Sequence, residues 1–293
     1  MTTTIHSLPL SNSLSRTGLA AELRALRAVI RREWVIFRRY PSWLIAMFVW
    51  PVIFPAVYIL IGRALAGPDG SGLALFKQVA GTNDFLGYIV IGTTVWMWQN
   101  VVLWGVGFTL REDQLRGTLE SNWLSPTWRF SFLLGSSVTQ LITMLIFLGV
   151  SAIEFALFFG VRLHGNPLLV LLMVAAAAPS IYGLGFAFAS LVITVKEANA
   201  FVFLVRGLVM IFCGITYPIS LLPGWMQGMA RWLPPTYIIR GMRNAALAGA
   251  DFQTLLADLA PLLIFGMAWL VIGYSLFNWM ERKARQSGAI GQY

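Results

Sequence analysis

The sequence predicts an all-α polytopic membrane protein with six transmembrane helices, and its composition is the first observation that supports this. The 293 residues are 58% hydrophobic and only 11% charged, with a mean hydropathy of +0.73. Soluble domains average about 45–50% apolar and about 25% charged residues. The second observation is that the apolar residues gather in runs of about 20 or more, the length that a helix needs to cross a bilayer.

Two segments are expected before the first span. Residues 1–17 are rich in Ser and Thr and are predicted to be disordered. Residues 18–40 place apolar side chains every three or four positions, which predicts an amphipathic helix with a separate stripe formed by Arg24, Arg27, Arg31 and Arg38. A basic amphipathic helix before a span is typical of a helix lying in the membrane interface. The alternative, a helix packed in a soluble subdomain, lacks a second soluble segment to pack on.

Residues 41–280 hold the predicted membrane domain. Its six spans are expected at about 42–62, 85–110, 128–160, 167–194, 200–218 and 255–279. The small residues of AAAAPS and GLGFAFAS in the fourth span predict close approach of a neighbouring helix. Four prolines make residues 218–250 too broken to cross, so we expect short re-entrant helices there, on the external side. Residues 281–293 form a charged tail.

One polar segment, residues 111–126, separates the second and third spans. Its charges cannot lie in hydrocarbon: Arg111, Glu112, Asp113, Arg116 and Glu120. Apolar residues four positions apart predict one short helix over about 111–125 with a shared face made by Leu115, Leu119 and Trp123. Ser125 and Pro126 then fit the N-cap and first-turn proline of the next helix. We interpret the polar segment as a cytoplasmic docking site for another protein.

The positive charge agrees with one membrane orientation. Most of the 21 Lys and Arg residues lie before residue 40, in the polar segment and in the tail. Since cytoplasmic loops of membrane proteins are enriched in Lys and Arg, both termini and the polar segment are expected in the cytoplasm. This explains the formal net charge of +9 without nucleic acid, for which no binding motif is present. The single cysteine, Cys213, excludes an intrachain disulfide.

Five residues in or beside the spans are candidates for a translocation path: Trp96, Trp98, Glu154, Arg206 and Tyr217. Tryptophans could contact a sugar or amphiphile by stacking, but they also serve as interface anchors and packing residues. Charges are costly in lipid, so Glu154 and Arg206 indicate either a path or ion pairs. These two are expected near opposite leaflets, which leaves Arg240 or Arg243 as the predicted partner of Glu154. Asp258 is expected at the interface.

No pattern for catalysis appears in the sequence. The two histidines, His6 and His164, lie far apart, and no His, Cys, Asp or Glu cluster has metal-ligand spacing. Neither a G-x-S-x-G motif nor a G-x-x-x-x-G-K-[ST] phosphate-binding loop is present. We therefore expect no enzymatic activity and no cofactor in this chain.

Two motifs carry a resemblance to a known family. One is Gly117-Thr118-Leu119-Glu120 with Leu124-Ser125-Pro126, and the other is Gly214…Pro218…Leu222-Pro223-x-Trp225…Leu233-Pro234-Pro235-Thr236-Tyr237…Arg240. At these topological positions, and over about residues 20–280, the chain resembles the membrane subunits of ABC-2 type exporters.

The resemblance implies an ATP-driven exporter in a bacterial plasma membrane. Two copies of the permease would surround the path, and two copies of a separate ABC ATPase would carry ATP and magnesium. The polar segment would be the coupling helix, with these contact residues: Arg111, Glu112, Arg116, Gly117, Thr118, Leu119, Glu120 and Trp123. The cargo would be a glycan, a lipid or lipid-linked molecule, or a drug.

Two other functions fit the topology. A secondary transporter or channel would need no ATPase, but it predicts inverted repeats and paired intramembrane charges. A non-transporting membrane scaffold would keep the spans but would not need a coupling helix.

Overall fold

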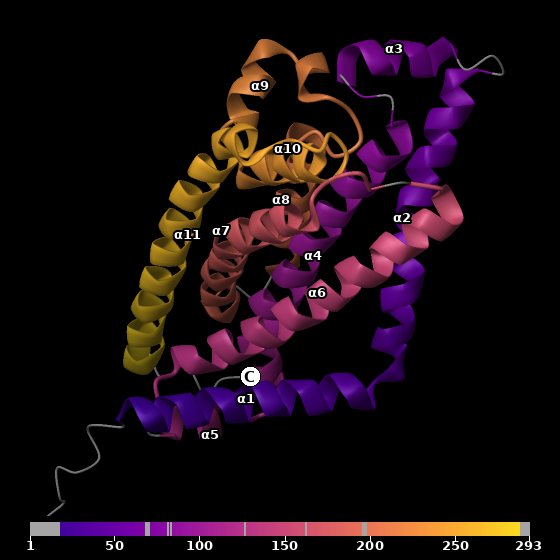
Figure 1. Cartoon of the computed structure of the whole chain (residues 1–293). Coiled ribbons are helices and arrows are strands. Elements are labelled where there is room, and N and C mark those ends of the chain that lie inside the picture. Colours follow the sequence, from indigo (N-terminus) through magenta and orange to yellow (C-terminus); the bar gives the residue numbers. More distant parts are fainter. Residues whose placement is uncertain are drawn as a thin grey trace, which may run out of the picture.

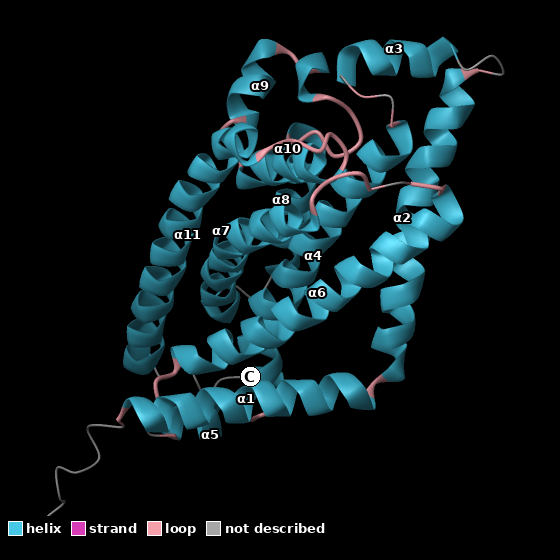
Figure 2. Cartoon of the chain, in the orientation of Figure 1, coloured by secondary structure: helices cyan, strands magenta, loops and turns pink. Residues whose placement is uncertain are grey.

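The computed structural model describes residues 18–67, 71–80, 82, 84–125, 127–161, 163–194 and 198–287. These residues form helices joined by loops and contain no strand, as the all-α prediction expects (Figure 2). The predicted disorder of residues 1–17 and the last residues of the tail, 288–293, lie outside the described parts of the chain.

Two helices form an L at the start of the described chain. α1 (Leu19–Arg39) lies across one end of the molecule, and α2 (Pro41–Ala66) runs along its side (Figure 1). α1 packs mainly on α6 (Phe130–Phe159), where Val29 is buried. A Cβ added at Gly135 of α6 would lie 2.5 Å from a methyl carbon of Val29, so the glycine permits this contact. The predicted amphipathic helix is therefore present and joined to the bundle.

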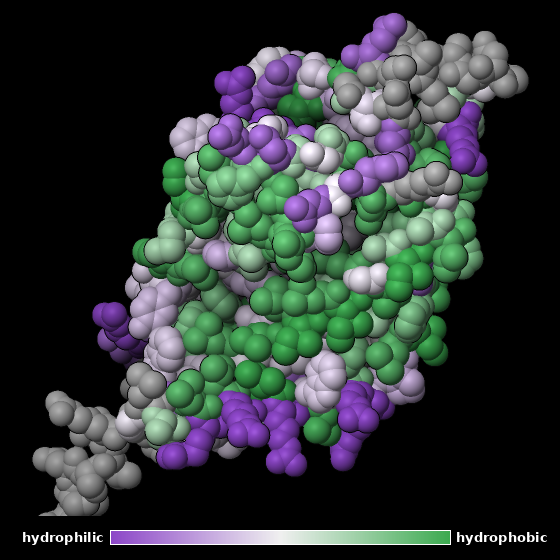
Figure 3. Space-filling view, viewed as in Figure 1, coloured by the Kyte–Doolittle hydropathy of each residue, from purple (hydrophilic) through white to green (hydrophobic). Residues whose placement is uncertain are grey.

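Among the described residues, five helices are long and apolar enough to cross a membrane: α2, α4 (Phe85–Leu115), α6, α7 (Pro167–Thr194) and α11 (Phe252–Ser287). α4 is the central helix, because 83% of its apolar window is buried, against 17% for α2 and for α6. A hydrophobic band covers the visible side of the molecule between two hydrophilic ends (Figure 3). The protein is therefore a multi-pass membrane protein.

Among the described helices, α7 and α11 share the most extensive contact, and small residues permit it. A Cβ at Gly183 would lie 2.6 Å from the backbone of Trp269, and one at Gly273 would lie 2.6 Å from the carbonyl oxygen of Gly183. Both helices therefore approach at positions where a larger side chain would collide with backbone. This confirms the packing role predicted for the small residues of the fourth span.

The segment predicted as the fifth span, 200–218, folds as α8 (Ala198–Phe212) followed by a turn. With 15 residues, α8 is about 22 Å long at 1.5 Å per residue, against about 30 Å of hydrocarbon. Gly214 lies in the left-handed region with φ at +69°, so the chain leaves the helical path before Tyr217.

Short helices lie at the end of the molecule opposite α1: α3 (Ser71–Ala80), the 3₁₀ helix η2 (Ile219–Leu221), α9 (Gly224–Ala230) and α10 (Pro234–Ala246) (Figure 1). The last three confirm that residues 218–250 are broken into short helices. α10 packs on α7, α11 and α4. Its Arg243 donates hydrogen bonds to the carbonyl oxygens of Tyr88, Gly214 and Ile215, at 2.8–3.2 Å. This side chain joins α10 to the start of α4 and to the turn after α8.

Candidate functional site

The polar segment folds as the end of α4, a tight turn and a separate short helix, α5 (Leu119–Leu124). α4 continues through Arg111 to Leu115, and Gly117 then adopts a φ of +69°. The Gly117 amide donates to the carbonyl oxygen of Gln114 and the Thr118 amide to that of Asp113, at 3.0 and 2.9 Å. A left-handed glycine with these bonds terminates a helix. The prediction of one helix over 111–125 is therefore wrong.

The predicted apolar face of the polar segment does not form. Leu115 belongs to α4 and is 67% exposed, whereas Leu119 and Trp123 of α5 are buried in the main hydrophobic core. The apolar side chains that this region offers to solvent are Leu115 and Leu124, the latter 86% exposed. Leu119 and Trp123 thus hold α5 against the bundle.

Ser125 ends α5 instead of starting the next helix. Its hydroxyl donates to the carbonyl oxygen of Asn122 at 2.8 Å, and its backbone is extended. α6 begins only at Phe130, so the N-cap prediction for Ser125 is wrong. Pro126 lies outside the described residues.

Asp113 is the hydrogen-bonding centre of the turn, a role that no sequence pattern indicates. Its side chain is buried and accepts from the Thr118 hydroxyl and the Asn122 amide, both at 3.2 Å. Arg32 of α1 lies 3.7 Å from the same carboxylate. One buried carboxylate therefore connects the end of α4, the turn, α5 and α1.

Further polar contacts extend this arrangement to α6 and α11. Glu22 of α1 accepts from the Trp128 amide at 3.1 Å and from the Ser131 hydroxyl at 3.3 Å. Arg129 donates to the carbonyl oxygen of Trp123 and forms an ion pair with Glu281 near the end of α11. We call the assembly of α1, the turn, α5 and these ends of α6 and α11 the polar platform.

The other predicted coupling residues lie at the surface of the polar platform. Arg111 donates to the side-chain oxygen of Gln114 at 2.6 Å. Glu112 and Arg116 form an exposed i,i+4 ion pair at 3.0 Å, a type that contributes only about 0.3–0.5 kcal/mol to stability. The side chain of Glu120 is outside the described part of the structure. The exposed charges and leucines are thus available to a partner.

In the membrane, Trp96 lies between two other helices. Its ring stacks on Phe54 of α2 with centroids 4.7 Å apart, and the Arg206 guanidinium of α8 lies 5.0 Å from its centroid. The indole N–H also donates to the Arg206 carbonyl oxygen at 3.4 Å. Trp96 and Arg206, predicted separately, therefore meet at one place.

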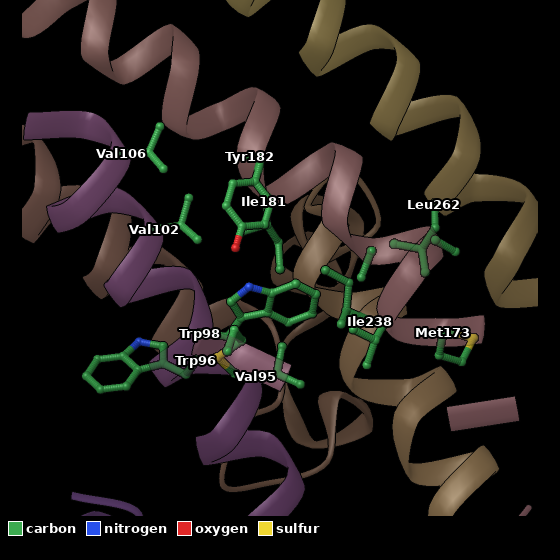
Figure 4. Close-up of a cluster of buried hydrophobic side chains, with 14 of the residues drawn as sticks. Val95, Trp96, Trp98, Val102, Val106, Met173, Ile181, Tyr182, Ile238 and Leu262 are labelled. Atoms are coloured by element: carbon green, nitrogen blue, oxygen red, sulfur yellow. The ribbon is translucent and has the colours of Figure 1, made fainter. Parts of the chain in front are cut away.

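Trp98 lies in the protein interior instead. It is 1% exposed, and Figure 4 shows its indole nitrogen facing the Tyr182 hydroxyl of α7, with Ile181 and Ile238 beside the ring. Both polar atoms are buried, and neither has a hydrogen-bond partner in the described part of the chain. A neighbouring cavity of about 200 Å³ is lined mostly by apolar side chains of α7, α8 and the start of α10, together with Gln99 of α4 and Trp269 of α11. Trp98 is therefore a core residue.

The predicted ion pair of Glu154 is wrong. Among the described residues, Arg240 pairs with Asp258 at 2.6 Å and Arg243 donates to backbone carbonyl oxygens, while one carboxylate oxygen of Glu154 is buried without a hydrogen bond. Asp258 is 1% exposed, so its carboxylate is buried within the protein, and its position at the membrane interface stays a prediction. The physical reason is the packing of α10 on α11, which places Arg240 against Asp258. Tyr217 donates from its hydroxyl to the Ile211 carbonyl oxygen and so closes the end of α8.

Comparison with known families settles the class of the protein. The family described as ABC-2 type transporter matches residues 24–247, about three quarters of the chain. The chain belongs to the ABC-2 type transporter family. No curated protein matches it. This ABC-2 chain is thus a transmembrane subunit of an ABC transporter, and the family match covers α4, the turn, α5 and α8.

Proposed function

We propose that this ABC-2 subunit is the permease of an ATP-driven exporter and that a separate ATPase binds the polar platform. The observation that carries the proposal is the connection made by Asp113. A partner that presses on the exposed Leu115, Arg116 or Leu124 acts on α5 and the turn, which the buried carboxylate connects to α4 and α1. Motion at the platform would therefore reach the central membrane helix.

The proposal also covers the subunit composition, the membrane topology and the cargo of the exporter. Two copies of the permease surround the path, and two ATPase copies hold ATP and magnesium. α8 with the turn after it is the fifth of six crossings, and both termini lie in the cytoplasm of a bacterial cell. α1 and α5 lie together at one end of the bundle, which supports a cytoplasmic platform (Figure 1). The proposed cargo is a glycan, a lipid or lipid-linked molecule, or another amphiphile.

Affinity purification of the tagged chain from its native membrane tests the proposal. We expect an ABC ATPase to co-purify and the complex to hydrolyse ATP. Leu124→Asp should abolish co-purification, because it places a charge at an 86% exposed leucine of α5. Leu221→Asp is the matched control, since this leucine is 60% exposed at the opposite end. Recovery of the folded wild-type chain without an ATPase would refute the proposal and favour a secondary transporter or channel.

A further inference from the structure

Arg206 occupies an unusual position for an arginine. It lies within α8, about 12 Å along the axis from the first residue at 1.5 Å per residue. The apolar neighbours on the same helix include Phe201, Leu204 and Leu208, which are 48%, 57% and 36% exposed. A charge at such depth is costly, and in membrane proteins it commonly marks a path for ions or substrates.

Within the described part of the chain, the guanidinium of Arg206 has no counter-ion. Among the described residues it takes part in no ion pair and donates no side-chain hydrogen bond. Arg240 and Arg243 differ, since one pairs with Asp258 and the other bonds three carbonyl oxygens. The charge of Arg206 is therefore available to a group from outside the described fold.

Aromatic rings hold the guanidinium in place. Its carbon lies 5.0 Å from the Trp96 centroid and 5.6 Å from the Phe203 centroid. Trp96 is itself fixed by its stack on Phe54 and is only 8% exposed. Cation–π contacts attract the charge but use none of the five N–H donors of an arginine. The site thus presents an oriented cation whose hydrogen-bonding capacity is free.

We propose that Arg206, Trp96 and Phe203 form a binding site for the phosphate group of an amphiphile carried through the membrane. The planar fork of N–H groups matches the oxygens of a phosphate, which forms short, charge-assisted hydrogen bonds with arginine. The exposed apolar side chains of α8 contact the hydrocarbon attached to that phosphate. The proposal rests on the exporter function and narrows its cargo to an amphiphile that bears a phosphate.

Photo-crosslinking of the chain alone, in lipid nanodiscs, tests the site. The probes are a dodecyl phosphate with a diazirine in its chain and the matching diazirine dodecanol. We expect Arg206→Gln to reduce labelling of α4 and α8 by the phosphate probe about tenfold or more, with Arg206→Lys intermediate. Arg231→Gln, at an exposed arginine outside the spans, should leave labelling unchanged. Dodecanol should label every variant equally.

Several outcomes would overturn the proposal. Undiminished phosphate labelling in Arg206→Gln would exclude the site, and an equal fall with dodecanol would show altered packing instead. If the Arg206→Gln and Glu154→Gln variants both failed to form a dimer, Arg206 would instead form an ion pair with Glu154 of a second copy. Displacement of the probe by equimolar phosphatidylglycerol, without stimulation of ATP hydrolysis in the complex, would make the site a lipid anchor.

The two proposals can fail separately, because labelling needs no ATPase. Absence of a co-purifying ATPase with intact Arg206-dependent labelling refutes the exporter function alone. Co-purification of an ATPase with labelling independent of Arg206 refutes only the phosphate site.

Discussion

Removal of the Asp113 carboxylate should loosen the turn and α5 without unfolding the bundle. Asp113→Ala eliminates the hydrogen bonds from Thr118 and Asn122 and the ion pair with Arg32. A hydrogen bond to a charged group contributes about 1.5–3 kcal/mol, but Thr118 is exposed, so water replaces part of that contribution. Removing the buried charge also removes its desolvation cost. We expect a net local loss of about 2 kcal/mol, or about 30-fold in the opening equilibrium.

Hydrogen exchange followed by mass spectrometry measures this local opening of the turn and α5. Amides of residues 113–125 should exchange about 30-fold faster in Asp113→Ala, whereas those of α7 should keep the wild-type rate. Asp113→Asn, which retains one oxygen acceptor, should give a smaller increase. ATP hydrolysis in the complex should continue but lose its dependence on cargo. Unchanged exchange in 113–125, or an equal rise in α7, would refute the role assigned to Asp113.

Three further predictions concern packing and buried polar contacts, each checked by thermal unfolding and size-exclusion chromatography in detergent. Gly183→Leu should separate α7 from α11 and yield aggregated protein, whereas Gly149→Leu, with nothing within 4 Å of its added Cβ, should behave like wild type. Arg243→Met should lower stability by about 3 kcal/mol, because three carbonyl acceptors lose their donor. Arg240→Ala should destabilise by about 3 kcal/mol and more than Asp258→Asn, since it alone leaves the buried Asp258 carboxylate without its counter-ion, with a 3.5 Å contact to the Asn244 amide remaining; equal effects would contradict this reasoning.

Local signals predicted most helices well. The fourth predicted span, 167–194, coincides with α7 because Asn166-Pro167 begins it and the apolar run is uninterrupted. The amphipathic pattern of 18–40 and the proline-broken segment 218–250 likewise appear as α1 and as short helices. Periodicity and proline are properties of neighbouring residues, so they can be read without knowledge of the fold.

The predictions that proved wrong concern features of the structure that depend on tertiary contacts. The repeat of Leu115, Leu119 and Trp123 continues through Gly117, whose left-handed turn redirects the chain and buries only the last two. Gly117 after Leu115-Arg116 was a usable helix-end signal that the repeat obscured. The pairing of Arg240 with Asp258 depends on how α10 packs on α11, which no spacing reveals. The same is true of the burial of Asp113, which in sequence is one charge among five.

α4 runs without interruption from Phe85 to Leu115, so Trp96 and Asp113 belong to one rigid rod and lie about 26 Å apart along it. Such a rod transmits tilt and rotation as well as displacement, and its two ends cannot turn independently. A single residue inserted between these positions would rotate one relative to the other by about 100°. The rotation of Trp96 relative to Asp113 about the axis of α4 is therefore fixed by the number of residues between them. Substitutions in α4 preserve this rotation, whereas insertions would change it.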